Sequence, residues 1–105
     1  MASKPEEALA YQLKLSKIKF VREVLFVPGR KFRADFFIEP NILVEVNGGL
    51  HLPYGGHTGK KSILRDMEKN NLAVLHGFKP LSFDSGAVYS GSALAFILSV
   101  LRGNK

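Results

Sequence analysis

Three short segments rich in β-branched and aromatic residues follow one another in the first half of the chain. Residues 20–27 (FVREVLFV) end at a Pro-Gly pair, residues 31–38 (KFRADFFI) end at Glu-Pro-Asn, and residues 42–47 (ILVEVN) end at two glycines. Segments of this composition, bounded by turn residues, are typical of β-strands. Because the turns between them are short, successive strands pair antiparallel. The sequence therefore predicts a three-strand meander.

Helical patterns precede and follow this meander. Residues 4–18 and 61–76 carry apolar side chains at helical spacing, residues 78–83 (FKPLSF) predict a short fourth strand, and an apolar helix capped by Asp84 or Ser85 extends to residue 101. The helix between the third and fourth strands is a crossover connection. We expect an α/β fold, an α+β mixed sheet in the order α-β-β-β-α-β-α, with helices on its faces. Pro80 predicts that the fourth strand lies at an edge or is irregular.

Composition excludes several classes of protein. The 105 residues fit one domain (residues 1–105), and their 46% hydrophobic content argues against wholesale disorder. Without cysteine, neither a disulfide framework nor a thiolate metal site can form. The apolar run near residues 93–101 is too short for a membrane span, and the N-terminus lacks the apolar core of a secretory signal. We expect a cytoplasmic protein with no membrane partner.

The charge balance favours a polyanionic partner. Fifteen Lys and Arg residues against nine Asp and Glu give a formal net charge of +6. A small basic domain of this kind often binds nucleic acid, and a basic surface with no such partner is the alternative. Arg22, Arg30, Lys31 and Arg33 gather around the predicted first hairpin, where they could form a basic surface.

Two acids are expected to meet on one face of the meander. If the second turn is centred on Pro40, residues pair when their numbers sum to 80, and Asp35 lies opposite Glu45. Opposed side chains have Cβ atoms about 4.5–5.5 Å apart, so two carboxylates there repel unless a cation lies between them. Mg²⁺, with Mn²⁺ as a substitute, suits such a pair, and Lys31 and Arg33 could hold a phosphate backbone beside it.

A solvent-exposed arrangement, with both acids paired to Arg33 or Lys31, is the alternative. Against it, Glu45 lies within ILVEV, an apolar run in which an unpartnered acid is expensive to bury. The glycine-rich loop of residues 48–60 carries His51 and His57, which could bind phosphate, act as a general acid, ligate a transition metal or be merely solvated. The basic residues after the loop predict contacts with a DNA backbone or a solvated helix start: Lys60, Lys61 and Arg65.

The order of these motifs resembles the PD-(D/E)XK, or restriction-endonuclease-like, nuclease superfamily. More closely, the chain is similar to its small stand-alone phage and bacterial nucleases, related to very-short-patch-repair and Holliday-junction-resolvase-like enzymes. The matching pieces cover roughly residues 6–84: Glu7 in the first helix, residues 32–36 (FRADF), 44–49 (VEVNGG), 57–59 (HTG), 66–69 (DMEK), and the apolar residues from Leu72 to Phe83.

The resemblance implies a role for each matching residue. Asp35 and Glu45 would bind the catalytic metal, with the Val46 carbonyl as a further ligand. Many relatives have a lysine two residues after the glutamate, where this chain has Asn47. In related subgroups that lysine comes from the following helix, and Lys69, on the same side of that helix as Asp66, is the candidate here.

Two further roles follow from the same resemblance. Glu7 resembles the first-helix acid that some relatives use for a metal-bound water or a second metal. Asn47 would orient a ligand or the attacking water by hydrogen bonding.

These expectations define a function and its alternatives. The first is a Mg²⁺-dependent endodeoxyribonuclease of a bacterial or phage-infected cell. It is expected to select branched DNA or Holliday junctions by shape, because the chain has no room for a separate sequence-reading domain. A homodimer would supply the two active sites that a symmetric junction needs. The alternatives are a nicking or homing-type endonuclease, a nucleic-acid-binding module without catalysis, and a phage accessory protein that binds another protein.

Overall fold

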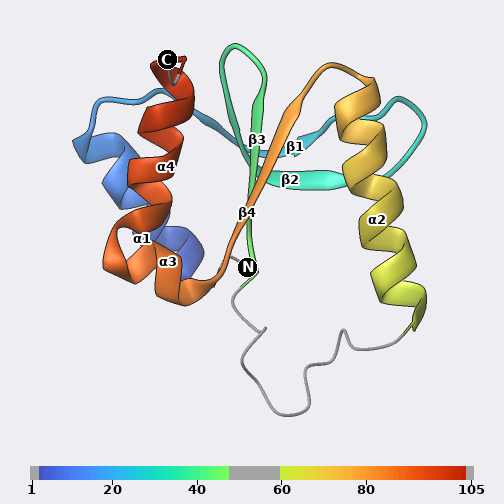
Figure 1. The fold of residues 1–105 in the computed structure, drawn as a ribbon, viewed down its shortest axis with the longest axis horizontal. Helices are drawn as coiled ribbons and strands as arrows, with labels where there is room; N and C mark the ends of the chain where they lie inside the picture. The colour runs from blue at the N-terminus through green and yellow to red at the C-terminus, as the bar shows by residue number, and fades with distance from the viewer. Residues whose placement is uncertain (1–2, 48–59, 104–105) are drawn as a thin grey trace.

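A computed structural model describes residues 3–47 and 60–103 of the chain. The elements in chain order are α1 (Lys4–Leu15), β1 (Val21–Leu25), β2 (Arg33–Ile38), β3 (Ile42–Val46), α2 (Lys60–Leu75), β4 (Lys79–Phe83), α3 (Ser85–Ser90) and α4 (Ser92–Leu101). The mixed sheet and the element order confirm the predicted fold class (Figure 1). Among the described residues, none of the helices is both long and apolar enough to cross a membrane.

The sheet has the predicted meander with β4 added at its edge. The strand order is β1-β2-β3-β4, in which the first three strands are antiparallel and β4 runs parallel to β3. Phe36 pairs with Val44 and Ile38 with Ile42, so the residue numbers of partners sum to 80 as predicted. The turn at Pro40 therefore determines which side chains of β2 and β3 lie opposite each other.

Helix α1 ends earlier than the predicted residue 18. Ser3 caps its N-terminus, since the Ser3 hydroxyl accepts a hydrogen bond from the Glu6 N–H at 3.3 Å. At the other end Lys17 adopts a left-handed conformation (φ 60°), and the N–H of Ile18 donates to the Leu13 carbonyl at 3.0 Å. This pattern is a Schellman motif, in which lysine takes the position that glycine usually occupies.

The last predicted helix is two helices. Asp84 caps α3 by accepting a hydrogen bond from the Ala87 N–H at 2.8 Å. Gly91 then adopts a left-handed conformation (φ 88°), which ends α3 and redirects the chain into α4. The apolar spacing continues through both helices, so periodicity alone did not reveal the break.

The two strands of the first hairpin are shorter than predicted. Residues 26–32, which join β1 to β2, hold three apolar side chains that are buried outside any strand: Phe26, Val27 and Phe32. Their apolar character reflects burial in a core cluster with Leu43 and Ala73 rather than strand pairing. Apolar residues in a loop that folds back onto the core carry the same sequence signal as a strand.

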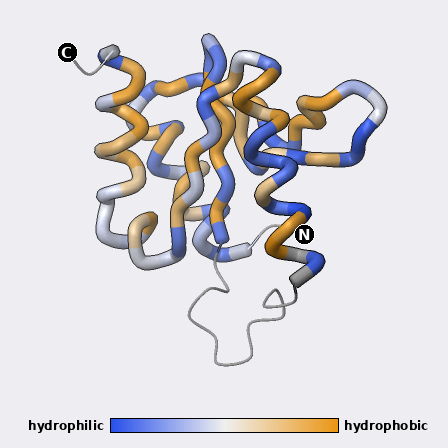
Figure 2. The backbone as a smooth tube through the Cα atoms, turned by 45° about the vertical axis from the view of Figure 1, so that its right-hand side comes forward, coloured by the Kyte–Doolittle hydropathy of each residue, from blue (hydrophilic) through white to orange (hydrophobic). Residues whose placement is uncertain are grey.

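The two faces of the sheet are covered unequally. On one face, which we call the closed face, α1, α3 and α4 pack together over the strands (Figure 1). Its core is fully buried and centres on Leu9, Leu13, Phe36, Val44 and Ile97. On the other, the open face, α2 lies alone against a smaller cluster. Figure 2 shows polar stretches alternating with apolar ones along α2, beside the sheet.

Candidate active site

Asp35 of β2 and Glu45 of β3 each lie one residue beyond the last pair of the β2–β3 ladder, Phe36 with Val44. Continuing that pairing by one residue along each strand would place Asp35 opposite Glu45. The Val46 N–H donates to Asp35 Oδ2 at 2.8 Å. This hydrogen bond satisfies a backbone donor near the end of β3 and holds the Asp35 carboxylate against that strand.

Lys69 of α2 contributes the cation at this position. Its Nζ forms an ion pair with Glu45 Oε2, and the exposed fractions of the two side chains are 19% for Lys69 and 28% for Glu45. Burial lowers the pKa of the Lys69 ammonium, the negative charge of Asp35 acts to raise it, and the positive charge of Arg33 lowers it. The Lys69 ammonium thus lies near two carboxylates in a partly desolvated setting, and it offsets only one of their two negative charges.

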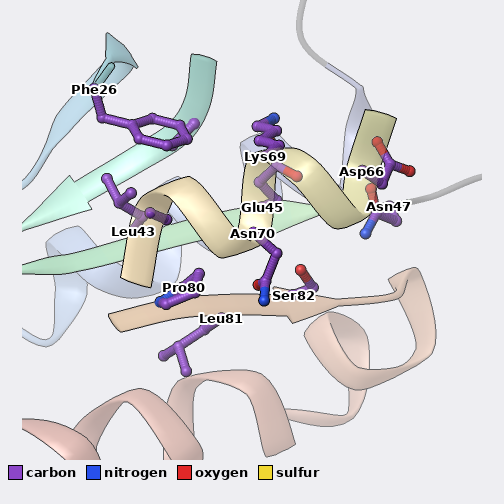
Figure 3. A pocket seen from close by; sticks show the side chains of 12 residues that line it. Phe26, Leu43, Glu45, Asn47, Asp66, Lys69, Asn70, Pro80, Leu81 and Ser82 are labelled. Carbon is purple, nitrogen blue, oxygen red and sulfur yellow. The ribbon is translucent and has the colours of Figure 1, made fainter. Parts of the chain in front are cut away.

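An open cleft of about 90 Å³ lies between α2 and the sheet, with Glu45 and Lys69 in its wall (Figure 3). Leu43 and Glu45 of β3 and Asn47, the residue just after β3, all line it, so these alternate residues share one face. Lys69 and Glu45 lie side by side in Figure 3, and Asp66 lies beside Asn47. The cleft is therefore apolar at the Leu43 end and polar at the Asn47 end.

Two polar residues of the cleft were missed by the sequence analysis. Asn70 of α2 and Ser82 of β4 line it together with the predicted groups, and their side chains approach each other in Figure 3. Ser82 pairs with Glu45 in the parallel ladder between β3 and β4. The sequence did offer one signal for Ser82. A helix between β3 and β4 predicts that the two strands are parallel neighbours, and the register of that pair then places Ser82 next to Glu45.

Glu7 is not brought to this cleft. Arg22 binds Glu7 Oε2 at 2.8 Å and Glu6 Oε2 at 2.9 Å, and its guanidinium lies 5.3 Å from the centre of the Phe36 ring. The Arg22 side chain lowers the pKa of Glu7. These contacts join α1 to the closed face, so Arg22 is a structural residue and not the part of a basic surface that its sequence position indicated. A catalytic role for Glu7 stays a prediction.

Two of the predicted DNA contacts lie together on the open-face side of the molecule. The guanidiniums of Arg30 and Arg65 lie 4.4 Å and 5.0 Å from the centre of the buried Phe32 ring. Arg30 also pairs with Glu68 of α2 at 3.0 Å, which holds the loop before β2 against the helix. Arg30 and Arg65 thus form a cationic pair with fixed positions, carried by the first-hairpin loop and by α2.

The other predicted contacts are less constrained. Lys31 is exposed, and Arg33, whose side chain is 58% exposed, lies 3.7 Å from Glu23. Lys60 is the first residue of α2, and Lys61, in its first turn, is exposed. His51 and His57 lie outside the described residues. The predicted roles of these six residues stay predictions.

The donor set defines which metal this site could hold. Within residues 3–47 and 60–103, no group of three or more His, Cys, Asp or Glu side chains converges. Asp35 and Glu45 therefore offer two carboxylates, an oxygen set that suits a hard cation such as Mg²⁺, which keeps several waters.

Comparison with known proteins supplies a fold relationship. No protein-family profile matches the sequence, and no curated protein matches it significantly. Among solved structures, the catalytic domain of the homing endonuclease I-Bth0305I superposes with a TM-score of 0.71, covering 93% of each chain at 15% sequence identity. The chain therefore has the fold of a homing endonuclease catalytic domain.

Proposed function

We propose that this protein is a Mg²⁺-dependent DNA endonuclease that hydrolyses phosphodiester bonds. The observation that carries the proposal is the gathering of two carboxylates around one ammonium: Lys69 pairs with Glu45 in the wall of the cleft, and the negative charge of Asp35 acts on the same lysine. A fold shared with a homing endonuclease catalytic domain supports it. The motif order that resembles the PD-(D/E)XK superfamily supports the same roles for these three residues.

Asp35 and Glu45 are the metal-holding groups in this proposal. A bound Mg²⁺ would polarise the scissile phosphate and lower the pKa of an attacking water. The Val46 N–H, by holding Asp35 Oδ2, limits the orientations open to that carboxylate. The Val46 carbonyl is proposed as a further ligand. Because the two carboxylates lie on paired strands, the sheet limits how far apart they can move.

Lys69 replaces the lysine that Asn47 does not supply. It approaches Glu45 from α2, across the cleft from the strand that carries the carboxylate. Its ammonium is placed to stabilise negative charge that develops on the phosphate, an interaction strengthened by partial burial. Asn47 and Asp66, at the polar end of the cleft, are proposed to orient water or a ligand.

The basic residues near α2 are proposed to hold the DNA backbone. Arg30 and Arg65 present two guanidiniums, both held against the Phe32 ring. Arg33 is close enough to Lys69 for its positive charge to lower the pKa of that lysine. Lys31 and Lys61 add exposed positive charge on the same elements. Such contacts bind phosphate regardless of sequence and weaken as salt concentration rises.

The substrate class has two candidates. Selection of branched DNA or Holliday junctions follows from the resemblance to junction resolvases, and cleavage at a homing-type duplex site follows from the structural likeness. The structural likeness spans nearly the whole chain and favours the homing-type enzyme. A panel of junction, flap, duplex and single-stranded substrates separates the two candidates by which member is cut fastest.

The decisive test measures cleavage with Mg²⁺ and Mn²⁺ in variants that keep the shape of each side chain. We expect Asp35→Asn, Glu45→Gln and Lys69→Met each to lower the cleavage rate by about 100-fold or more, since each removes several kcal/mol of charge stabilisation. Glu39→Gln, which neutralises an exposed acid just after β2, is the matched control and should cleave normally.

Two results would contradict the proposal. Undiminished cleavage by both carboxylate variants would exclude the metal site. Binding of DNA by the wild-type protein, without cleavage in any divalent metal, would favour the nucleic-acid-binding module instead.

A further inference from the structure

We propose that Glu23 is a positioning residue for the candidate site: its left-handed backbone bends the sheet at Asp35 and holds the Asp35 carboxylate at the end of β3. Among the described residues, two other than glycine have a positive φ, Lys17 (60°) and Glu23 (54°). Lys17 ends helix α1, where a left-handed residue is usual. Glu23 is the middle residue of β1, where this conformation costs free energy and no turn or helix end accounts for it.

The left-handed residue faces Asp35 across the sheet. Val24 pairs with Ala34, and the pair on the other side of Glu23 follows the same register. That register sets Glu23 against Asp35, yet within the described strands these two residues form no ladder pair. The β1–β2 ladder is therefore interrupted at one position, and this position holds a residue proposed to bind the metal.

The β2–β3 ladder ends beside the same residue of β2. Its last pair is Phe36 with Val44, and a regular continuation would bring Val46 opposite Ala34. The N–H of Val46 donates instead to Asp35 Oδ2 at 2.8 Å. A side-chain carboxylate thus accepts the hydrogen bond that a strand carbonyl would otherwise accept, which requires β2 to turn away from β3 at Asp35.

A single bend in the sheet explains both interruptions. Strand β1 stays paired with β2 on both sides of Asp35, so β1 has to follow a bend in β2 at the residue that faces it. A left-handed residue provides such a bend, much as a β-bulge does when it redirects a side chain beside an active site. Figure 1 shows β2 lying at a steep angle to β3. Glu23 therefore supplies the part of β1 in the bend that directs Asp35 toward Val46.

The charge of Glu23 does not account for its conformation. Its carboxylate lies 3.7 Å from the Arg33 guanidinium, and at least half of each side chain is exposed, so this ion pair contributes little. Nor is Glu23 a third acid of the site, since no three such side chains converge within residues 3–47 and 60–103. An extended Glu23 would face Asp35 directly, and like charges in opposite positions destabilise a sheet. The backbone of Glu23, and not its charge, is what the site uses.

This role for Glu23 rests on the proposed function, in which Asp35 binds the metal. Valine at position 23 tests it, because β-branched residues rarely adopt a positive φ. Glu23→Val should straighten β1 and draw the Asp35 carboxylate away from Val46. We expect the Kd for Mg²⁺, measured by calorimetry, to rise about tenfold or more, the usual cost of losing a group that orients a metal ligand. In metal-free protein, NMR should no longer detect scalar coupling across the Val46–Asp35 hydrogen bond.

Glycine at the same position should rescue the site. Glycine adopts left-handed conformations at no steric cost, so Glu23→Gly should keep the Val46–Asp35 hydrogen bond and bind Mg²⁺ within about twofold of wild type. The matched control is Lys17→Val, which places the same side chain at the other left-handed residue, after α1. Both valine variants should unfold at lower urea concentration than wild type, but Lys17→Val should bind Mg²⁺ normally. A merely structural role for Glu23 would make the two variants alike.

Several results would overturn the role of Glu23. A folded Glu23→Val that binds Mg²⁺ as wild type does is one, and a Glu23→Gly that loses the metal as Glu23→Val does is another. If Glu23→Val does not fold, the wild-type protein decides, because NMR coupling constants report φ and an extended Glu23 would exclude the bend. A wild-type protein that binds Mg²⁺ but cuts no DNA would contradict only the proposed function, since Mg²⁺ affinity and the hydrogen bond do not depend on cleavage.

Discussion

The closed and open faces of the sheet differ in what they bury. The closed face places three helices over fully buried residues such as Phe36 and Ile97, and its one buried acid, Glu6, is paired with Arg22. The open face has a single helix, a smaller apolar cluster, and a half-buried lysine among carboxylates. Since apolar burial is the main source of folding free energy, the closed face supplies most of the stability, and the open face can accommodate a charged cleft.

Strand β3 shows how one segment serves both faces. Ile42 and Val44 point to the closed face and are buried in its core. Leu43 packs into the open-face cluster, and Glu45, two residues later, lies at the cleft. The alternation of side chains along a strand therefore separates packing from chemistry within five residues.

The largest expected effect compares the same substitution on the two faces. Leu13→Ala on α1 should lower the free energy of unfolding by about 3–5 kcal/mol, because Leu13 is fully buried in the closed-face core. Leu72→Ala on α2 removes the same atoms from a half-buried position and should cost about 1–2 kcal/mol. Urea denaturation of both variants measures the difference.

Equal losses for the two variants would break the comparison, since they would show that the open face contributes as much to stability as the closed one. Ala8→Gly, a change at a half-buried position of α1, controls for helix propensity and should cost about 1 kcal/mol.

Much of the fold was predictable because its determinants are local. The turn at Pro40 sets the β2–β3 register, so the pairing of Phe36 with Val44 and of Ile38 with Ile42 followed from the position of the turn. The ends of the helices were harder to predict from the sequence. A lysine at a left-handed position ends α1, and Gly91 breaks a continuous apolar pattern, so in both places backbone conformation decides and hydrophobic spacing does not.

The cleft was predictable only in part, for a physical reason. Asp35 and Glu45 lie on neighbouring strands, and Lys69 came from the resemblance to a nuclease superfamily. Asn70 and Ser82 enter the cleft because α2 lies across β3 and β4 at a particular position. That position depends on how Ala73 and Leu43 pack together, which is a long-range property that no short motif records.

The second prediction sharpens the contrast by adding metal to the open face. Mg²⁺ at about 100 times its Kd should raise the free energy of unfolding of the wild-type protein by about 2.7 kcal/mol, because only the folded state holds both carboxylates together. Glu45→Gln should abolish this stabilisation. Lys69→Met frees Glu45 from its ion pair and should bind Mg²⁺ more tightly while cleaving more slowly.

Thermal unfolding with and without Mg²⁺ measures these shifts, and Glu39→Gln should respond to the metal as wild type does. Weaker Mg²⁺ binding by Lys69→Met would show that the lysine does not compete with the cation for Glu45. A metal response retained by Glu45→Gln would place the binding site elsewhere.

The smallest effect concerns pH and belongs to Lys69. Because burial lowers the pKa of Lys69 in the folded chain, the unfolded chain binds more protons between that lowered pKa and the ordinary value of 10.5. The free energy of unfolding should therefore rise with pH across that window, and Lys69→Met should lose this contribution.

Asp35→Asn should lower the pKa of Lys69 further, since it removes an attractive charge, and Arg33→Gln should raise it, since it removes a repulsive one. NMR titration of the lysine side chains in metal-free protein measures the pKa, and a Lys69 resonance that titrates like those of exposed lysines would show that the open face leaves this ammonium fully hydrated.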